Sequence, residues 1–179
     1  MTLYHFSESP GIAVFDPRSP LARPEVEPLV WAVDAEHAWT YLFPRDCPRI
    51  LLWKVAATTD SDWRRWAGAN ETGKVACIEH RWFERLRTTT LYRYTLPPDF
   101  FEPLTNEPWM FVSRLAVSPI SVDTIDDAVA ALGEAGVELR LMPSLEPFRG
   151  AWESTVHLSG IRLRNAVGWE SESTELPGS

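Results

Sequence analysis

A single histidine stands inside a strand-like run close to the start of the chain. His5 lies in LYHFSES, residues 3–9, whose composition predicts a short β-strand followed by a turn. An imidazole can donate or accept hydrogen bonds and can gain a proton near neutral pH, so a histidine in a strand needs a partner. Taken alone, such a residue is more often structural than functional. The residues that accompany His5 therefore decide its interpretation.

The two cysteines offer a different chemistry. Cys47 lies between two arginines in PRDCPR, and nearby positive charge favours a nucleophilic thiolate. No partner histidine is identifiable from spacing, so a small residue packed in a proline turn is the preferred interpretation. Cys77 and His80 are three residues apart, but neither CxxC nor HExxH occurs, and the sequence predicts no metal site. Phosphate-binding glycine loops and the GxSxG serine motif are also missing from the sequence.

The charge balance limits the classes of partner. The formal net charge is −8, with 25 Asp and Glu against 17 Lys and Arg, so nucleic-acid binding is disfavoured. The segment 79–94 alternates arginine with aromatic rings, as RNA-stacking surfaces do, but an amphipathic helix followed by a half-buried strand is the preferred interpretation. No window approaches the ~18 apolar residues of a membrane helix. With two cysteines and no signal segment, we expect a cytoplasmic protein.

Hydrophobic periodicity predicts a set of strands and helices around one core. Strands are predicted at 3–6, 12–15, 29–33, 50–56, 91–96, 110–117, 137–142 and 161–167. Helices are predicted at 36–43, 62–67, 75–87, 125–136 and 145–158. Strands occur in runs with irregularly placed helices, which indicates the α+β class. We expect a single globular domain over residues 1–169 and a polar, disordered tail over residues 170–179.

Three segments together resemble the N-terminal half of the ADP-ribosyltransferase fold, which includes the diphtheria-toxin-like poly-ADP-ribose polymerases. His5 and Ser7 resemble the strand in which a histidine precedes a small polar residue. Trp31-Ala32 resembles the strand that ends in an aromatic-alanine pair, and Tyr41 resembles the tyrosine on the helix that follows. The resemblance implies a split β-sheet with flanking helices. Taken whole, the sequence also resembles an uncharacterised bacterial family with HFSE, VWA, FPRDCPR, LYRY and ELR segments.

The resemblance covers about the first quarter of the chain and implies binding roles for five of its residues. NAD would be bound as the substrate, without a metal, with its nicotinamide riboside in the split of the sheet. His5 would hydrogen-bond the ribose, and the backbone of Phe6 would hold the amide. Tyr41 would stack on the nicotinamide ring, and Tyr4 or Trp31 would complete the wall around it.

The resemblance also implies a catalytic acid that binds the ribose and stabilises an oxocarbenium-like transition state. Glu107 precedes the strand predicted at 110–117 and is the candidate, with Glu102 nearby. Pro108 departs from the expected pattern, and an exposed loop carboxylate is the alternative interpretation of either glutamate. Phe6 is a second departure, because glycine often occupies this position. Strand alternation directs its ring away from His5, which reduces the obstruction.

Two functions from different classes follow. The first is ADP-ribosyl transfer from NAD to an unknown acceptor, with catalytic residues His5 and Glu107. The second is a non-enzymatic module that binds a nucleotide or a peptide in the same cleft. An RNA 2′-phosphotransferase would need a basic cleft, for which the early arginines are the available cluster: Arg18, Arg23, Arg45 and Arg49. A structural or interaction protein whose tryptophans fill the core is a further alternative.

Overall fold

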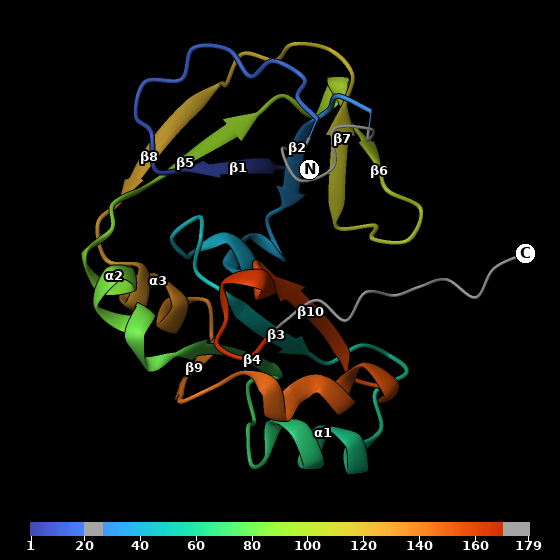
Figure 1. Ribbon diagram of the computed structural model, residues 1–179. Helices are drawn as coiled ribbons and strands as arrows, with labels where there is room; N and C mark the ends of the chain where they lie inside the picture. Colours follow the sequence, from blue (N-terminus) through green and yellow to red (C-terminus); the bar gives the residue numbers. More distant parts are fainter. Residues whose placement is uncertain (20–26, 170–179) are drawn as a thin grey trace, which may run out of the picture. The chain divides into compact units, whose positions relative to one another are not determined.

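The structure is a computed structural model of the chain, and it describes residues 1–19 and 27–169. These residues divide into two compact units (Figure 1), each built from two segments of the chain. Unit 1 comprises Met1–Arg45 and Thr88–Ala131, and unit 2 comprises Asp46–Arg87 and Leu132–Ser179. The single domain expected over residues 1–169 stays a prediction. The expected disordered tail, residues 170–179, lies outside the described residues.

Unit 1 contains a six-stranded antiparallel sheet with the strand order β6-β7-β2-β1-β5-β8. Its strands are β1 (Leu3–Ser7), β2 (Val30–Asp34), β5 (Leu91–Leu96), β6 (Glu102–Pro103), β7 (Met110–Ser113) and β8 (Ser121–Ile125). The short 3-10 helices η1 (Ala38–Tyr41) and η3 (Pro98–Phe100) belong to the same unit. Successive strand residues point to opposite faces, so the sheet has a separate hydrophobic cluster on each face.

Each face of this sheet collects a different set of side chains. One cluster is fully or nearly buried and contains Leu3, Val30, Ala32, Tyr94 and Leu96 among others. The other is centred on Val33, Ala38 and Met110, and half-buried aromatic rings pack against it, namely Tyr4, Phe6, Trp31, Tyr41 and Trp109. The second face thus carries the predicted binding residues with aromatic side chains.

Unit 2 contains a four-stranded sheet with the order β10-β3-β4-β9, in which only the β4 and β9 pair is parallel. Its elements are β3 (Arg49–Trp53), α1 (Asp60–Ala67), β4 (Lys74–Glu79), η2 (His80–Trp82), α2 (Phe83–Thr88), β9 (Glu138–Met142), η4 (Glu146–Glu153), β10 (His157–Ile161) and η5 (Leu163–Asn165). Every residue of β3 is buried. The remaining helix, α3 (Ala128–Glu134), passes from unit 1 into unit 2 after Ala131, and the last residue of α2, Thr88, is the first of a segment of unit 1.

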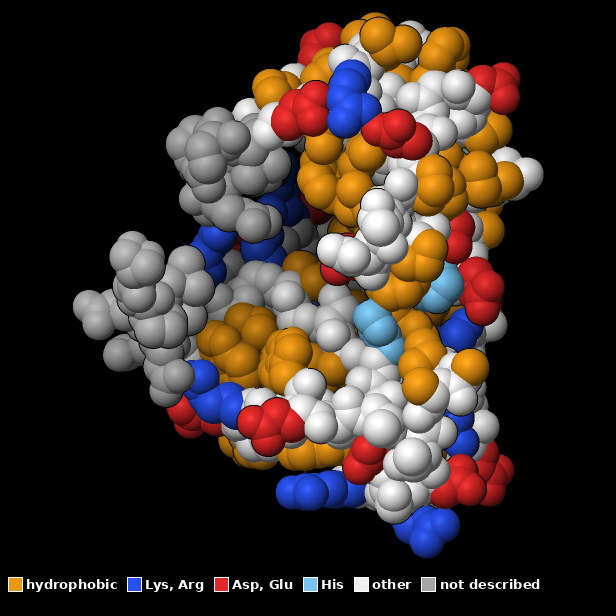
Figure 2. Space-filling view, turned by 90° about the vertical axis from the view of Figure 1, so that its right-hand side faces the viewer, with side chains coloured by type: hydrophobic (Ala, Val, Ile, Leu, Met, Phe, Trp, Pro, Cys, Tyr) orange, Lys and Arg blue, Asp and Glu red, His pale blue; other side chains and the backbone are white. Residues whose placement is uncertain are grey.

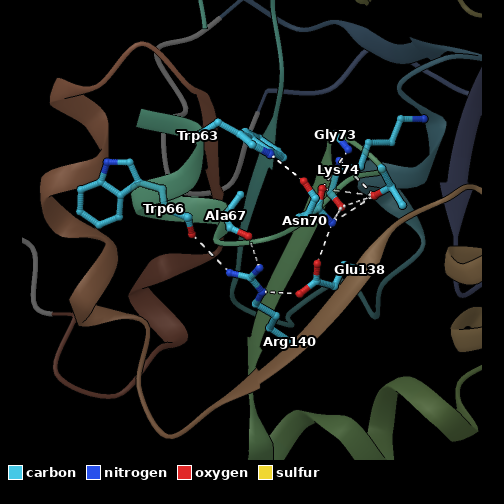
Figure 3. Close-up of polar contacts among 9 residues, drawn as sticks. Trp63, Trp66, Ala67, Asn70, Gly73, Lys74, Glu138 and Arg140 are labelled. Carbon is cyan, nitrogen blue, oxygen red and sulfur yellow. Dashed lines mark hydrogen bonds and ion pairs between the residues drawn. The ribbon is translucent and has the colours of Figure 1, made fainter. Parts of the chain in front are cut away.

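A polar network fixes the end of α1 against the sheet of unit 2 (Figure 3). The Arg140 guanidinium donates to the carbonyls of Trp66 and Ala67, which lack partners within the helix. Its Nε also donates to Glu138 Oε1 at 2.7 Å, and Asn70 Nδ2 donates to Glu138 Oε2 at 2.6 Å. Positive charge at a helix C-terminus is favourable. Arg140 therefore couples α1 to β9.

The predicted α+β class is confirmed, but several element boundaries are wrong. The segment predicted as one helix over 75–87 is a buried strand up to Glu79, then a 3-10 turn and the short helix α2. A continuous apolar run fits a buried strand as well as a buried helix, and pairing with two neighbouring strands decides the outcome. Val75, Ala76, Cys77 and Ile78 are all buried in that sheet.

Other observed element boundaries differ from the predicted ones. The helix predicted over 125–136 starts at Ala128, because Asp127 Oδ1 accepts from the Ala130 N–H and acts as its cap. The residues before it form β8, which sequence periodicity missed. The strand predicted at 12–15 is reduced to a bridge between Phe15 and Val117. The segment 145–158 is a 3-10 helix followed by β10, and the predicted helix at 36–43 is the single turn η1.

Candidate functional site

The site begins where two neighbouring strands of unit 1 separate. Strands β1 and β2 pair only at Leu3 with Asp34 and at Tyr4 with Val33. Beyond these pairs β1 stays on β5 as far as Ser7, while β2 stays on β7 back to Val30. Figure 1 shows the two strands running in clearly different directions from this point. The sheet of unit 1 is therefore split between β1 and β2.

A pocket of about 70 Å³ lies at this split. Its lining residues come from β1, β2, η1 and β7: Tyr4, His5, Phe6, Trp31, Ala32, Val33, Tyr41 and Met110. All five binding residues predicted from the sequence are among them. Pockets that enclose a drug-sized ligand measure roughly 300 to 1,000 Å³. This pocket therefore accommodates one ring or a similarly small group rather than a whole nucleotide.

Strand register places backbone groups at the split. The carbonyl of Trp31 accepts a hydrogen bond from the His5 side chain, so this residue directs its backbone polar groups toward β1. Continued in register from Tyr4 and Val33, Phe6 lies opposite Trp31. By the alternation of the ladder, the N–H and C=O of Phe6 then face β2. A donor and an acceptor at one position are the groups that a carboxamide needs.

The protonation of His5 follows from its hydrogen bond. Its Nδ1 lies 2.8 Å from the carbonyl oxygen of Trp31, and a carbonyl can only accept, so Nδ1 carries the hydrogen. Burial lowers the pKa of His5, an effect that outweighs the opposing hydrogen bond to Trp31, and the positive charge of Arg45 lowers it further. At neutral pH the ring is therefore uncharged, and its Nε2 is an acceptor. The ring itself packs on Phe15, with centroids 4.6 Å apart.

Aromatic rings form the apolar part of the pocket. The rings of Phe6 and Tyr41 are nearly parallel, with an interplanar angle of 17° and centroids 6.3 Å apart. Tyr4 meets Phe6 edge-on at 6.4 Å. The Tyr41 hydroxyl donates to Met110 Sδ at 3.5 Å, which connects η1 to β7. The site thus offers flat apolar faces beside one imidazole and a short stretch of backbone.

The predicted acids are not among the pocket-lining residues. Glu107 is exposed in the loop between β6 and β7, where its carbonyl accepts from the Met110 N–H at 2.8 Å. Glu102, the alternative, is in β6 and pairs with Arg114, which also binds Glu27 at 2.7 Å. Of the two, Glu107 is closer in sequence to a lining residue, Met110. Neither carboxylate is placed against His5 by any contact.

Sequence reasoning missed some residues around the site. Val33 and Met110 line the pocket, and they face each other across the β2 and β7 ladder. Asp34, at the end of β2, accepts from the His37 backbone N–H and from His37 Nδ1, both at 2.8 Å. The His37 ring lies against Trp109, with centroids 5.3 Å apart. A sequence signal was available, because Asp34 directly follows the strand predicted at 29–33 and an aspartate side chain often accepts from the backbone a few residues further on.

The cysteine alternatives do not form a reactive site. Cys47 and Cys77 are both fully buried, and burial raises the pKa of each thiol to about 12. Cys47 therefore lacks the thiolate that a nucleophile requires. Among the described residues, no group of three or more His, Cys, Asp and Glu side chains is arranged to hold a metal ion.

The sequence matches a family of unknown function, DUF6886, over residues 4–166. The chain belongs to this family. The match covers both units and the whole of the β1–β2 split, so the candidate site is part of the DUF6886 domain. Comparisons with curated proteins and with solved structures returned no match. Within the described residues, no helix combines the length and the hydrophobicity needed to cross a membrane.

Proposed function

We propose that the β1–β2 split binds the nicotinamide end of NAD and that the protein transfers ADP-ribose to an acceptor. One observation carries the proposal: the five residues assigned to this ligand from the sequence line one small pocket. The volume fits a single ring, so the remainder of the nucleotide would lie outside it. Tyr41 and Phe6 would contact the ring faces, and Phe6 backbone groups would hold the amide.

His5 has a specific part in this scheme. Its neutral Nε2 accepts a hydrogen bond from a ribose hydroxyl, while Nδ1 stays bound to the Trp31 carbonyl. The hydrogen bond from Nδ1 to the Trp31 carbonyl fixes the orientation of the imidazole, so the ring need not become ordered when the ligand binds. His5 is thereby a positioning group for the ribose.

The transfer step needs few protein groups. The bond between the ribose C1′ and the pyridinium nitrogen breaks, and nicotinamide leaves as a neutral molecule with the bonding electron pair. An acceptor oxygen or nitrogen bonds to C1′ and releases its proton to water or to a base. Glu107 would stabilise the positive charge on the ribose if its loop moves to the bound nucleotide.

Calorimetric titration with NAD tests the binding step. Wild-type protein should bind at millimolar concentration or below, and His5→Ala should weaken binding about tenfold, which corresponds to about 1.4 kcal/mol. His80→Ala is the matched control, because this histidine is exposed in unit 2. Absence of binding by the wild type at millimolar NAD would remove the proposal.

A second candidate is a binding module without catalysis, and the position of Glu107 favours it. This carboxylate is exposed and is not a lining residue. Release of nicotinamide from NAD by the wild type, lost in Glu107→Gln with unchanged NAD affinity, would establish the transferase. NAD binding without any release in wild type and variant alike would establish the module.

A further inference from the structure

The pocket at the β1–β2 split has aromatic walls, and none of its lining side chains carries a formal charge. Four of its eight lining residues are Phe, Tyr or Trp, namely Tyr4, Phe6, Trp31 and Tyr41, and Met110 contributes a thioether. The faces of aromatic rings carry negative potential and attract cations, most strongly where water is excluded. Methionine sulfur is polarisable and makes favourable contacts with aromatic rings. Such walls distinguish ligands by charge as well as by shape.

One lining ring already attracts a cation within the protein. The Arg93 guanidinium lies 4.8 Å from the centroid of the Tyr4 ring. Its own charge is largely compensated, because Arg93 Nη2 lies 3.0 Å from Asp123 Oδ2. The pocket rim therefore gains little net positive charge from this arginine.

The net charge of unit 1, counted over its sequence, also favours a positive ligand. Unit 1 contains twelve Asp and Glu residues but five Lys and Arg residues, whereas unit 2 has thirteen and twelve. A net negative charge on the unit that contains a site attracts cations to that unit. The positive charge of Arg45 lowers the pKa of His5 and would also repel a cationic ligand. Arg45 is exposed, so water and salt screen its charge. His5, the ionisable lining residue that could become a cation, is uncharged at neutral pH because burial lowers its pKa.

We propose that this pocket selects ligands by charge, binding a positively charged pyridinium ring more tightly than a neutral ring of the same size. The inference rests on the proposed function, since the pyridinium would be that of oxidised NAD. It adds a specificity rule: oxidised NAD should be preferred over NADH, whose dihydropyridine ring is neutral. Free nicotinamide, also neutral, should bind weakly and leave readily after transfer.

Small ring compounds allow the preference for a charged ring to be measured without the rest of the nucleotide. Calorimetry or ligand-observed NMR would compare 1-methylnicotinamide, a cation, with nicotinamide, its neutral parent. We expect about a tenfold tighter dissociation constant for the cation, the size of an interaction with a partly desolvated aromatic face. The same ratio is expected for NAD over NADH. Equal affinities, or tighter binding of the neutral rings, would overturn the inference while leaving NAD binding in place.

Two substitutions localise the preference to the pocket. Tyr41→Phe retains a ring and should retain the cation preference, whereas Tyr41→Leu should reduce it about threefold. Trp152→Leu is the matched control, because this tryptophan is 46% exposed in unit 2 and should not affect the ratio. An unchanged ratio in Tyr41→Leu, with native thermal unfolding, would contradict the assignment. If none of the four ligands binds at millimolar concentration, the proposed function fails as well.

Discussion

The antiparallel pair β3–β4 in unit 2 is complete, whereas the antiparallel pair β1–β2 in unit 1 is interrupted. In unit 2, β3 pairs with β4 over five consecutive residues, and all of β3 is buried. In unit 1, β1 pairs with β2 over two residues, and the strands then separate around His5. A complete ladder satisfies every backbone group and closes the core. An interrupted ladder leaves backbone and aromatic surface for a ligand, and the β1–β2 split is where we propose that the ligand binds.

Burial shifts the pKa values of ionisable groups in both units, but the groups differ in how far solvent reaches them. The interior thiols Cys47 and Cys77 have no access to solvent. His5 is only partly covered, although burial still lowers its pKa. Desolvation therefore keeps the two thiols of unit 2 protonated and unreactive, and it keeps the imidazole of His5 in unit 1 uncharged at neutral pH. The predictions below test this contrast, from the largest expected effect to the smallest.

Thiol labelling should separate the folded and unfolded protein most strongly. With pKa values of about 12, Cys47 and Cys77 should form thiolate on the order of a thousandfold less than ordinary cysteines, before any steric exclusion. Iodoacetamide at pH 8 should leave both unmodified in native protein and modify both in urea, as read by mass spectrometry. Rapid labelling of Cys77, which lies in β4, under native conditions would mean that the sheet of unit 2 opens, and labelling of Cys47 would mean that the segment before β3 opens.

Removal of a side chain from β3 should cost the most stability. Leu52 is fully buried in the cluster with Ile50, Trp63 and Val75, so Leu52→Ala should lower the free energy of unfolding by about 2 to 5 kcal/mol. Urea denaturation measures the change. Val55→Ala, at a residue 38% exposed in the same unit, is the control and should cost less than about 1 kcal/mol. Similar losses in both variants would show that β3 is not a closed core strand.

The arginine that couples α1 to β9 should have a smaller effect. Arg140→Gln removes the bonds to Trp66, Ala67 and Glu138 and should cost about 2 kcal/mol. Arg87→Gln breaks the exposed pair with Glu84 in α2 and should cost below about 0.5 kcal/mol. Thermal and urea unfolding of the two variants gives the comparison, and equal losses would contradict the assigned role of Arg140.

The pH dependence of unit 1 should give the smallest signal. The pKa of His5 is lower in the folded protein than its ordinary value of 6.5, so the unfolded chain binds more protons below that value. The free energy of unfolding should therefore fall as the pH drops through 6.5 and stay level above it, as far as His5 contributes. His5→Gln should lose this component, and His80→Gln should keep it. A fall that persists unchanged in His5→Gln would assign it to other groups.

The sequence predicts the strands whose side chains alternate or form long apolar runs. Segment 50–56 covers all of β3 except its first residue, segment 91–96 coincides with β5, and segment 110–117 contains β7. It does not predict β8, because SVDTI is mostly exposed and is held as a strand by backbone pairing with β5. Nor does it distinguish strand from helix over Val75–Ile78, where partners distant in sequence decide. Long-range pairing, invisible to local patterns, accounts for both errors.

The candidate site likewise combines residues that the sequence predicts with a geometry that depends on long-range strand pairing. His5, Trp31 and Tyr41 were assigned from the resemblance to the ADP-ribosyltransferase fold, and all three line one pocket. The pocket itself exists because β1 and β2 separate after Tyr4, which depends on what each strand pairs with on its other side. Glu107 was chosen because it precedes a strand, and closeness in sequence did not make it a lining residue.

The central claim is that the β1–β2 split holds the nicotinamide ring of NAD, and amide NMR tests it most directly. Titration of ¹⁵N-labelled protein with oxidised NAD should shift the backbone amides of Phe6, Trp31 and Val33 first and furthest. Resonances of β3 and β10 in unit 2 should stay in place. Saturable shifts centred on Phe6 are the predicted result. Unmoved Phe6 and Trp31 amides at millimolar NAD, or shifts confined to unit 2, would contradict the account.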